Sequence, residues 1–228
     1  MNDSAMNTSA QAPDPAPGSA PASAPPDRPD LGPVAEGVAR LLPGVPDERL
    51  DGPTPCPEYA VRDLLGHLHG LSAAFRDAAR KDLGPNTSTD PGSHRPVLPA
   101  DWRTSLPALL TDLAAAWRVP DAWDGMTQAG GVTFPASDAG MVALNELLVH
   151  GWDLARATDQ PYAPDPASLA VSRALLTPQE PDGPDGASEP DGAGNGLFGP
   201  VVPVPDDAPE LDRVVGLSGR HPDWTPRP

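Results

Sequence analysis

The chain has 228 residues, of which 34 are proline and 22 are glycine, and 38% of it is hydrophobic. Its formal net charge of -17 excludes nucleic acid and anionic membrane surfaces as expected partners, because both would repel the chain at long range. No apolar run has the length of a membrane helix, no secretory signal opens the chain, and a single cysteine excludes an internal disulfide, so we expect a cytoplasmic protein.

Composition divides the chain into four parts. Residues 1–29 are almost entirely small, polar or proline, and they cannot bury enough surface to offset the entropy of ordering, so a disordered tail is expected. Residues 178–195 carry five acidic residues and no basic one, which predicts a flexible acidic insertion. Residues 30–177 are predicted to form the folded domain, and residues 196–228 a C-terminal segment packed on it.

Apolar residues at helical spacing mark the first three helices. A short helix begins near residue 31 and ends at Pro43-Gly44. A second runs over 60–81, and a polar loop separates it from a third over 102–117. Pro107 lies inside the third pattern, so the helix either begins nearby or kinks there.

A fourth long helix follows a glycine-containing segment. Residues 128–137 contain a Gly-Gly pair between alternating apolar residues, which indicates a turn or an irregular hairpin. Ser137 or Asp138 is positioned to cap the next helix, which continues to about Thr158.

Shorter elements complete the chain. Asp165 and Pro166 predict the start of a helix that ends near Leu176. Residues 197–205 are rich in proline and expected to be extended, and 208–217 to form one or two helical turns. No pattern indicates a parallel sheet, so the predicted fold is all-α, an antiparallel four-helix bundle with an irregular C-terminal segment.

Glu146 and His150 are the first candidate functional residues. Residues i and i+4 are neighbours on a helix face, so both side chains can reach one metal ion. The best third ligand is His67, which lies on the flank of the apolar stripe of the 60–81 helix. His69 lies nearly on the opposite face of the same helix. Two histidines and one glutamate leave the fourth position of a zinc ion open, which is the property of catalytic zinc sites.

Helical periodicity also predicts the surroundings of these ligands. Glu146 and His150 share a strip with Asp153, beside an apolar stripe, and we expect this strip to be half-buried. Asp153 and Arg156 are candidates to orient the site or to form a helix salt bridge. A metal-free interpretation also stands, in which Glu146 and His150 form a solvated pair that stabilises the helix by a few tenths of a kcal/mol.

The two remaining candidates have ordinary explanations. Cys56 precedes the 60–81 helix, where a lowered thiol pKa would make it a nucleophile or ligand, but no base is identifiable near it. We therefore favour a small buried hydrophobic role for Cys56. His94 lies in the polar loop and is expected to be solvated.

Three separated stretches resemble a known family. CPEYAVRDLLGHLHG, ELLVHGWDLARATDQ and FGPVVPVPDDAPELDRVVGLSGRHPDW look like the signatures of actinobacterial metal-binding proteins of the DinB/YfiT-like superfamily, which share the metal-binding domain of mycothiol-dependent maleylpyruvate isomerase. The resemblance implies a DinB-like bundle that holds a divalent metal, commonly zinc, through His67, Glu146 and His150. It also implies that the metal positions and deprotonates a low-molecular-weight thiol such as mycothiol.

Two departures from this family pattern have consequences. The family usually has Trp-Thr where this chain has Tyr59-Ala60, so Ala60 cannot supply the hydroxyl of a capping box with Asp63, a loss of about 1 kcal/mol. The isomerase also has a substantial second domain, whereas residues 160–228 are short and interrupted by prolines, so maleylpyruvate is not the expected substrate.

Three functions follow from these observations. The first is a metal-dependent, mycothiol-using transferase or isomerase, whose partners are a small-molecule thiol and an electrophilic substrate. The second is a non-catalytic metal-binding or stress-related interaction module, and the third is a structural bundle with vestigial ligand positions. Bundles of this superfamily often dimerise, so a homodimer is compatible with all three.

Overall fold

A computed structural model describes residues 28–90, 92–93, 95–177 and 199–226. The tail expected to be disordered lies outside these ranges except for residues 28–29, and the acidic insertion and His94 lie outside them entirely.

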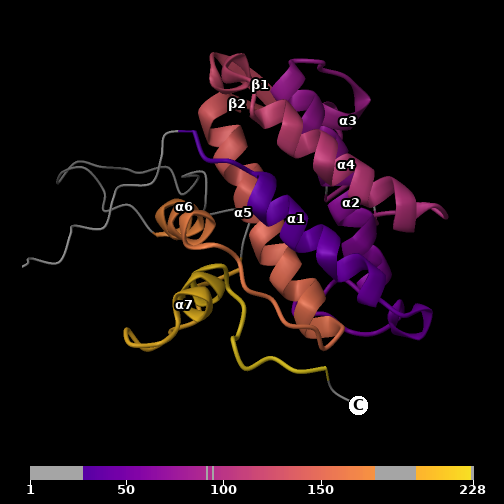
Figure 1. The fold of residues 1–228 in the computed structure, drawn as a ribbon, viewed down its shortest axis with the longest axis vertical. Coiled ribbons are helices and arrows are strands. Elements are labelled where there is room, and N and C mark those ends of the chain that lie inside the picture. The colour runs from indigo at the N-terminus through magenta and orange to yellow at the C-terminus, as the bar shows by residue number, and fades with distance from the viewer. Residues whose placement is uncertain (1–27, 91, 94, 178–198, 227–228) are drawn as a thin grey trace, which may run out of the picture.

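Four helices form the bundle, and each packs against two of the others (Figure 1). They are α1 Gly32–Leu41, α2 Val61–Arg80, α4 Trp102–Trp117 and α5 Ala136–Ala157. Both α1 and α2 contact both α4 and α5. The shared core consists of aliphatic and aromatic side chains that point inward from all four helices, among them Val38, Leu64, Leu68, Leu106, Leu113, Trp117, Leu144 and Leu147. The predicted all-α bundle is confirmed.

The direction of each helix follows from pairs of contacting residues. Thr127, just before α5, donates a hydrogen bond of 2.6 Å to the carbonyl of Ala78 near the end of α2, so α2 and α5 are antiparallel. By contrast, α2 and α4 run in the same direction, because His69 contacts Ser105 and Arg80 contacts Asp112. The connection between them, residues 81–101, must therefore return along the bundle, and it contains the short helix α3 Pro85–Ser88.

A β-hairpin leads into α5. Its strands, β1 Met126–Ala129 and β2 Val132–Pro135, pair antiparallel with Ala129 opposite Val132. Gly130 and Gly131 have φ angles of 59° and 78°, the left-handed conformation that a tight two-residue hairpin turn requires. The predicted hairpin is confirmed, although its strands begin two residues earlier than expected.

The predicted cap of α5 is wrong. This helix begins at Ala136 after an extended Pro135, and Ser137 and Asp138 already lie in its first turn. The physical reason is that β2 runs directly into the helix, which leaves no intervening position for a capping side chain. Instead, the amide of Ala136 donates to the carbonyl of Gly125, at 2.9 Å.

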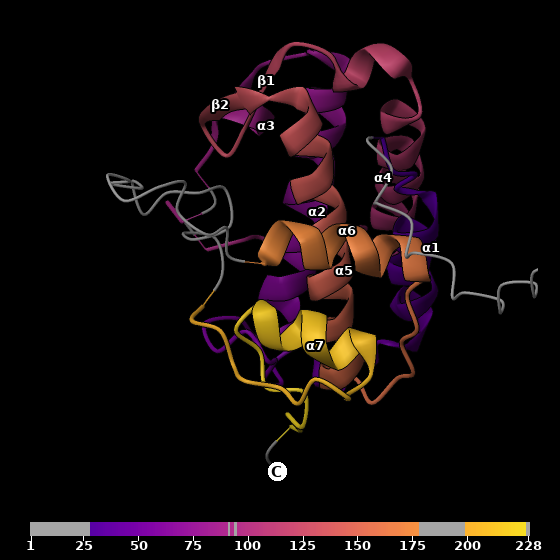
Figure 2. The same ribbon diagram turned by 90° about the vertical axis from the view of Figure 1, so that its left-hand side faces the viewer.

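Two short helices cover the outer face of α5. Figure 2 shows α6 Pro166–Leu176 and α7 Glu210–Leu217 lying crosswise over α5, with α7 beside α6. Asp165 caps α6 as predicted, because its carboxylate accepts from the amides of Ala167 and Ser168 at 3.1 and 3.0 Å. This cover buries α5 on nearly every side.

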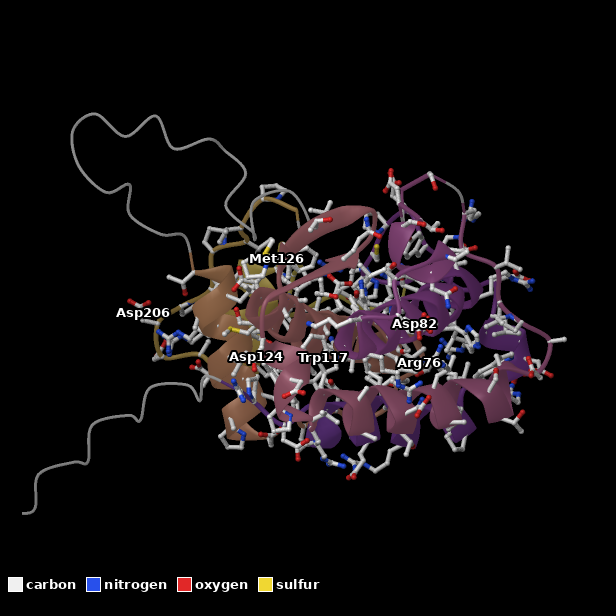
Figure 3. All side chains as sticks on the ribbon, turned by 90° about the horizontal axis from the view of Figure 1, so that it is seen from above. Arg76, Asp82, Trp117, Asp124, Met126 and Asp206 are labelled. Atoms are coloured by element: carbon white, nitrogen blue, oxygen red, sulfur yellow. The ribbon has the colours of Figure 1, made fainter. Side chains whose placement is uncertain are left out.

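Smaller elements occupy the ends of the bundle. Three 3-10 turns, η1 Leu42–Gly44, η2 Asp47–Arg49 and η3 Pro120–Trp123, follow α1 and α4. Viewed from above, Trp117 lies among the core side chains and Met126 lies on the hairpin, where 57% of it is exposed (Figure 3). Among the described residues, no helix combines the length and apolar character needed to cross a membrane.

We predict that a hydroxyl at position 60 will stabilise the fold. Ala60 is the N-cap of α2 in an extended conformation, and its amide donates to the Asp63 carboxylate at 3.0 Å, which is half of a capping box. Ala60→Thr should restore the other half and raise the free energy of unfolding by about 1 kcal/mol in urea denaturation. Ala60→Val, which has the same shape without the hydroxyl, should not, and equal stability of the two variants would contradict the prediction.

Candidate metal centre

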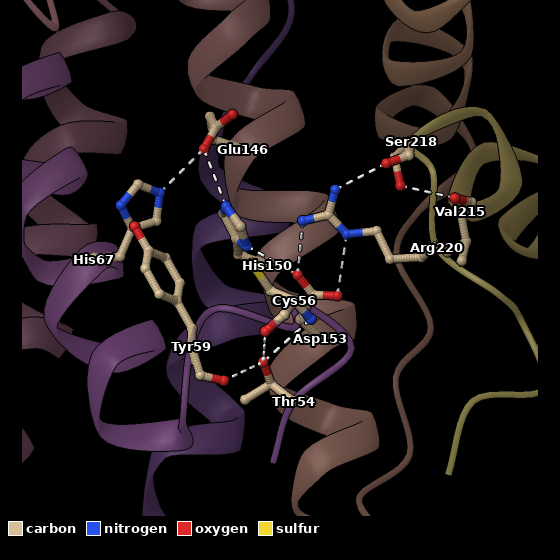
Figure 4. A network of polar contacts seen from close by, with 10 residues as sticks. All are labelled: Thr54, Cys56, Tyr59, His67, Glu146, His150, Asp153, Val215, Ser218 and Arg220. Atoms are coloured by element: carbon tan, nitrogen blue, oxygen red, sulfur yellow. Dashed lines mark hydrogen bonds and ion pairs between the residues drawn. The ribbon is translucent and has the colours of Figure 1, made fainter. Parts of the chain in front are cut away.

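Three donor side chains converge between α2 and α5. The Nε2 atom of His67 lies 3.4 Å from Glu146 Oε2, and His150 Nε2 lies 3.2 Å from the same oxygen (Figure 4). One ligand atom from each residue lies within 4.8 Å of the others. The structure thus brings together the three residues selected from the sequence, because antiparallel packing sets the N-terminal half of α2 against the middle of α5.

The spacing of these donors fits a zinc-like ion. Zinc bonds to imidazole nitrogen and carboxylate oxygen are about 2.0 to 2.2 Å long, so two donors on one tetrahedral ion are about 3.3 Å apart. The two nitrogen-to-oxygen distances, 3.4 and 3.2 Å, bracket that value. The chemistry also fits, since two imidazoles and one carboxylate suit a borderline divalent metal.

Asp153 holds the other side of the His150 ring. Its Oδ2 lies 2.9 Å from His150 Nδ1, so the Nε2 atom is directed at Glu146. A carboxylate behind a ligating histidine fixes the orientation and tautomer of the ring. Asp153 has no exposed surface, while Glu146 and His150 are 9% and 5% exposed. The expectation of a half-buried strip is therefore wrong, and at Asp153 the covering side chain comes from the C-terminal segment.

Arg220, from that segment, pairs with Asp153. Its two guanidinium contacts to the carboxylate measure 3.1 and 3.4 Å, and a third, to the carbonyl of Ser218, measures 2.9 Å. The end of α7 positions this arginine: Gly219 has a φ of 81°, and the amide of Arg220 bonds the carbonyl of Val215 at 3.1 Å. This is a Schellman ending, which glycine permits.

Sequence reasoning did not select Arg220. The available signal was a glycine directly after a predicted helical turn, followed by an arginine within the third signature stretch. That signal predicts how the helix ends, but it does not predict that the arginine faces a carboxylate on another helix.

The alternative of an Asp153 and Arg156 salt bridge is wrong. Arg156 instead donates twice to the carbonyl of Trp224, at 2.6 and 3.1 Å, and so fastens the end of the C-terminal segment to α5. His69 also lies away from the cluster, as its position on the helix predicts, and contacts Ser105 at 3.2 Å.

A turn before α2 brings Cys56 and Tyr59 to the lower side of the cluster (Figure 4). The hydroxyl of Thr54 closes the turn by hydrogen bonds of 2.8 Å with the carbonyls of both residues. Burial and the nearby charge of Asp153 raise the pKa of the Cys56 thiol. A raised pKa disfavours the thiolate, so the environment supports the packing role of Cys56 over that of a nucleophile.

Strong mutual electrostatics hold the buried acid and base in their charged forms. Burial alone would lower the pKa of His150, but hydrogen bonds with Asp153 and Glu146 raise it to about 9. Burial alone would raise the pKa of Glu146, yet the two histidines hold it well below its usual range. Without a metal, His150 is therefore an imidazolium between two carboxylates at neutral pH.

We predict a pH dependence for the stability of the metal-free protein. The pKa of His150 is about 9 in the folded chain and 6.5 in the unfolded chain. The contribution of His150 to the free energy of unfolding is therefore fully present below pH 6.5 and is lost as the pH rises through 9. With a chelator present, the free energy of unfolding should fall over this window by up to roughly 3 kcal/mol. His150→Gln should remove this slope, and an unchanged slope would contradict the assignment.

Known proteins of similar sequence include two from Mycobacterium tuberculosis. Two uncharacterized proteins of Mycobacterium tuberculosis, from strains CDC 1551 / Oshkosh and ATCC 25618 / H37Rv, are each 27% identical to this chain over 189 residues. The match covers 81% of this chain and 92% of each relative.

Solved structures of similar fold include two of one enzyme. The crystal structure of the mycothiol-dependent maleylpyruvate isomerase matches with a TM-score of 0.48, and that of its histidine-to-alanine mutant with 0.50. Both are 18% identical in sequence and cover 64% of this chain and 67% of the isomerase chain, a likeness that concerns the fold alone. The sequence profile of the mycothiol maleylpyruvate isomerase N-terminal domain matches residues 31–155, more than half of the chain and nearly all of the bundle. This chain therefore belongs to the family of the mycothiol maleylpyruvate isomerase N-terminal domain.

Proposed function

We propose that this protein is a mycothiol-dependent transferase or isomerase that uses one bound divalent metal, most readily zinc. The metal ligands in this proposal are His67, Glu146 and His150. The observation that carries the proposal is the convergence of these donors within 4.8 Å of one another, with the second nitrogen of His150 held by Asp153. Family membership supports the choice of mycothiol as the thiol cosubstrate. In this proposal residues 30–177 form the metal-binding domain, and residues 196–228 are a C-terminal segment packed on it.

The chain's own residues define what the site would do. A bound divalent ion would act as a Lewis acid that lowers the pKa of a thiol at its open position. Glu146 and the two histidines would hold the ion, and Asp153 would accept the Nδ1 proton of His150, which orients the ring and leaves Nε2 to bind the metal.

The charges at the site favour an anionic ligand. Arg220 compensates the charge of Asp153, and Glu146 compensates one of the two positive charges of a divalent ion. One positive charge is therefore left over when His150 is neutral. A thiolate would neutralise that charge, whereas a neutral thiol would not. A buried net charge is costly unless it is paired, so the site selects for the thiolate.

The small exposure of the ligands favours a second candidate, a non-catalytic metal-binding or interaction module. Glu146 and His150 are only 9% and 5% exposed, which limits access by a large substrate. The two candidates differ in turnover: a fully metal-loaded protein that shows no thiol-dependent reaction across a broad panel of electrophiles would favour the second. Thiol-dependent turnover that disappears in His150→Ala would favour the first.

We predict near-stoichiometric metal in the protein purified without a metal-affinity tag, measured per chain by mass spectrometry. His67→Ala, Glu146→Ala and His150→Ala should each lose most of the metal, because two remaining donors hold an ion weakly. His69→Ala is the matched control: it removes a histidine two residues from a ligand, on the side of α2 that contacts Ser105, and should keep its metal.

Two outcomes would contradict this prediction. Metal lost equally from the His69→Ala control would point to general unfolding and not to a ligand set. Absence of metal from the unmodified protein, even after incubation with zinc, nickel, manganese or iron, would leave a structural bundle and remove the basis of the proposed chemistry.

We predict that Asp153→Asn weakens metal binding without abolishing it. The asparagine can still contact His150, but it loses the negative charge that favours the ligating tautomer, and such outer partners typically affect metal affinity by about 10- to 100-fold. Competition with a metal-binding dye would measure the change. Arg156→Gln, one turn away and bound to Trp224, is the control and should retain the affinity of the unmodified protein. Equal affinities of the two variants would argue against an orienting role for Asp153.

A further inference from the structure

Tyr59 stands at the edge of the donor cluster with its backbone held on both sides. Its amide donates to the carbonyl of Cys56 at 3.0 Å, and its carbonyl accepts from the hydroxyl of Thr54 at 2.8 Å. Neighbouring Ala60 forms a bridge with Pro53. The aromatic ring is therefore presented from a fixed turn and not from a free loop.

The ring reaches the first proposed ligand. The centroids of Tyr59 and His67 are 5.5 Å apart with the rings inclined at 47°, a favourable aromatic contact. Figure 4 shows the side chain rising from the Thr54 turn, with the hydroxyl end beside His67 and below Glu146. The side chain is half-buried, so the hydroxyl lies at the boundary between the cluster and solvent.

The hydroxyl of Tyr59 is a donor without a partner. Within the described chain the hydrogen bonds of this residue involve its backbone, while its side chain packs against the edge of the core and makes a ring contact with His67. A phenol is protonated at neutral pH, so it has a proton to donate. The cationic Arg220, by comparison, already contacts Asp153 and the Ser218 carbonyl.

We propose that the Tyr59 hydroxyl donates a hydrogen bond to the sulfur of a small-molecule thiolate bound at the metal's open position. This inference rests on the proposed function, since it requires a metal on the three ligands. A hydrogen bond to an ionised acceptor is about twice as strong as one between neutral groups, so a single hydroxyl can set the affinity for the thiolate. Tyr59 thereby becomes a residue that contacts the thiol and favours its ionised form.

The test uses the full-length chain loaded with cobalt(II) in place of zinc and titrated with N-acetylcysteine. The probe is the absorption band that arises when a thiolate sulfur bonds to cobalt, and the measured quantity is the dissociation constant of the thiol. Tyr59→Phe removes only the hydroxyl and should raise this constant about tenfold or more, while the cobalt content and the thiol-free cobalt spectrum stay unchanged. An unchanged cobalt content and an unchanged thiol-free spectrum would exclude a merely structural effect of the substitution.

The chain offers a matched control in its other tyrosine. The hydroxyl of Tyr162 is also without a hydrogen-bond partner, but it is buried against Gly151 of α5, on the side where the loop after α5 passes. Tyr162→Phe should leave the dissociation constant of the thiol unchanged. A tenfold change in both variants would trace the effect to general loosening and overturn the inference.

The remaining outcomes separate this inference from the function on which it rests. Equal thiol affinity in Tyr59→Phe and the unmodified protein overturns the role of Tyr59 and leaves the metal site intact. Cobalt binding with no thiol-dependent band in the unmodified protein overturns both the inference and the thiol chemistry, and favours the non-catalytic module. Failure to bind cobalt overturns the metal site itself, and the inference with it.

Discussion

A chain of buried charges determines how this molecule is assembled. Glu146, His150 and Asp153 lie on one strip of α5, and their partners, His67 and Arg220, come from α2 and from the segment after α7. Buried charges destabilise a protein unless each has a partner, and Asp153 has no exposed surface at all. Arg220 is therefore not an accessory contact. The C-terminal segment is part of the folded unit because the arginine that compensates Asp153 belongs to it.

The same network joins the three separated stretches whose sequences resemble the family signatures. The first contains the turn with Tyr59 and the helix with His67, the second contains the strip of α5, and the third contains Arg220. They meet at one place, although 79 residues separate His67 from Glu146 and 67 separate Asp153 from Arg220. The intervening residues, including the hairpin and α4, need only preserve the packing that brings these segments together.

Most of the fold could be predicted because it follows from local periodicity. The spacing of apolar residues located all four bundle helices, and the i, i+4 relation paired Glu146 with His150 without any tertiary information. What failed depended on distant parts of the chain. The partner of Asp153 was expected three residues away, at Arg156, because a helix alone offers that contact; the folded chain instead supplies Arg220 and gives Arg156 the carbonyl of Trp224. Likewise, a capping side chain for α5, Ser137 or Asp138, was expected because the sequence does not show that β2 enters the helix directly.

The raised pKa of His150 suggests how such a site remains ordered before it binds a metal. Two buried carboxylates on one strip would repel each other, but the protonated His150 ring lies between Glu146 and Asp153 and supplies a positive charge that both of them contact. The metal-free chain is thus stabilised by Glu146, the carboxylate that would bind the metal, and by Asp153 behind the His150 ring. Because the ion must displace this proton, occupancy should weaken as the pH falls, and the protein can fold first and acquire its metal afterwards.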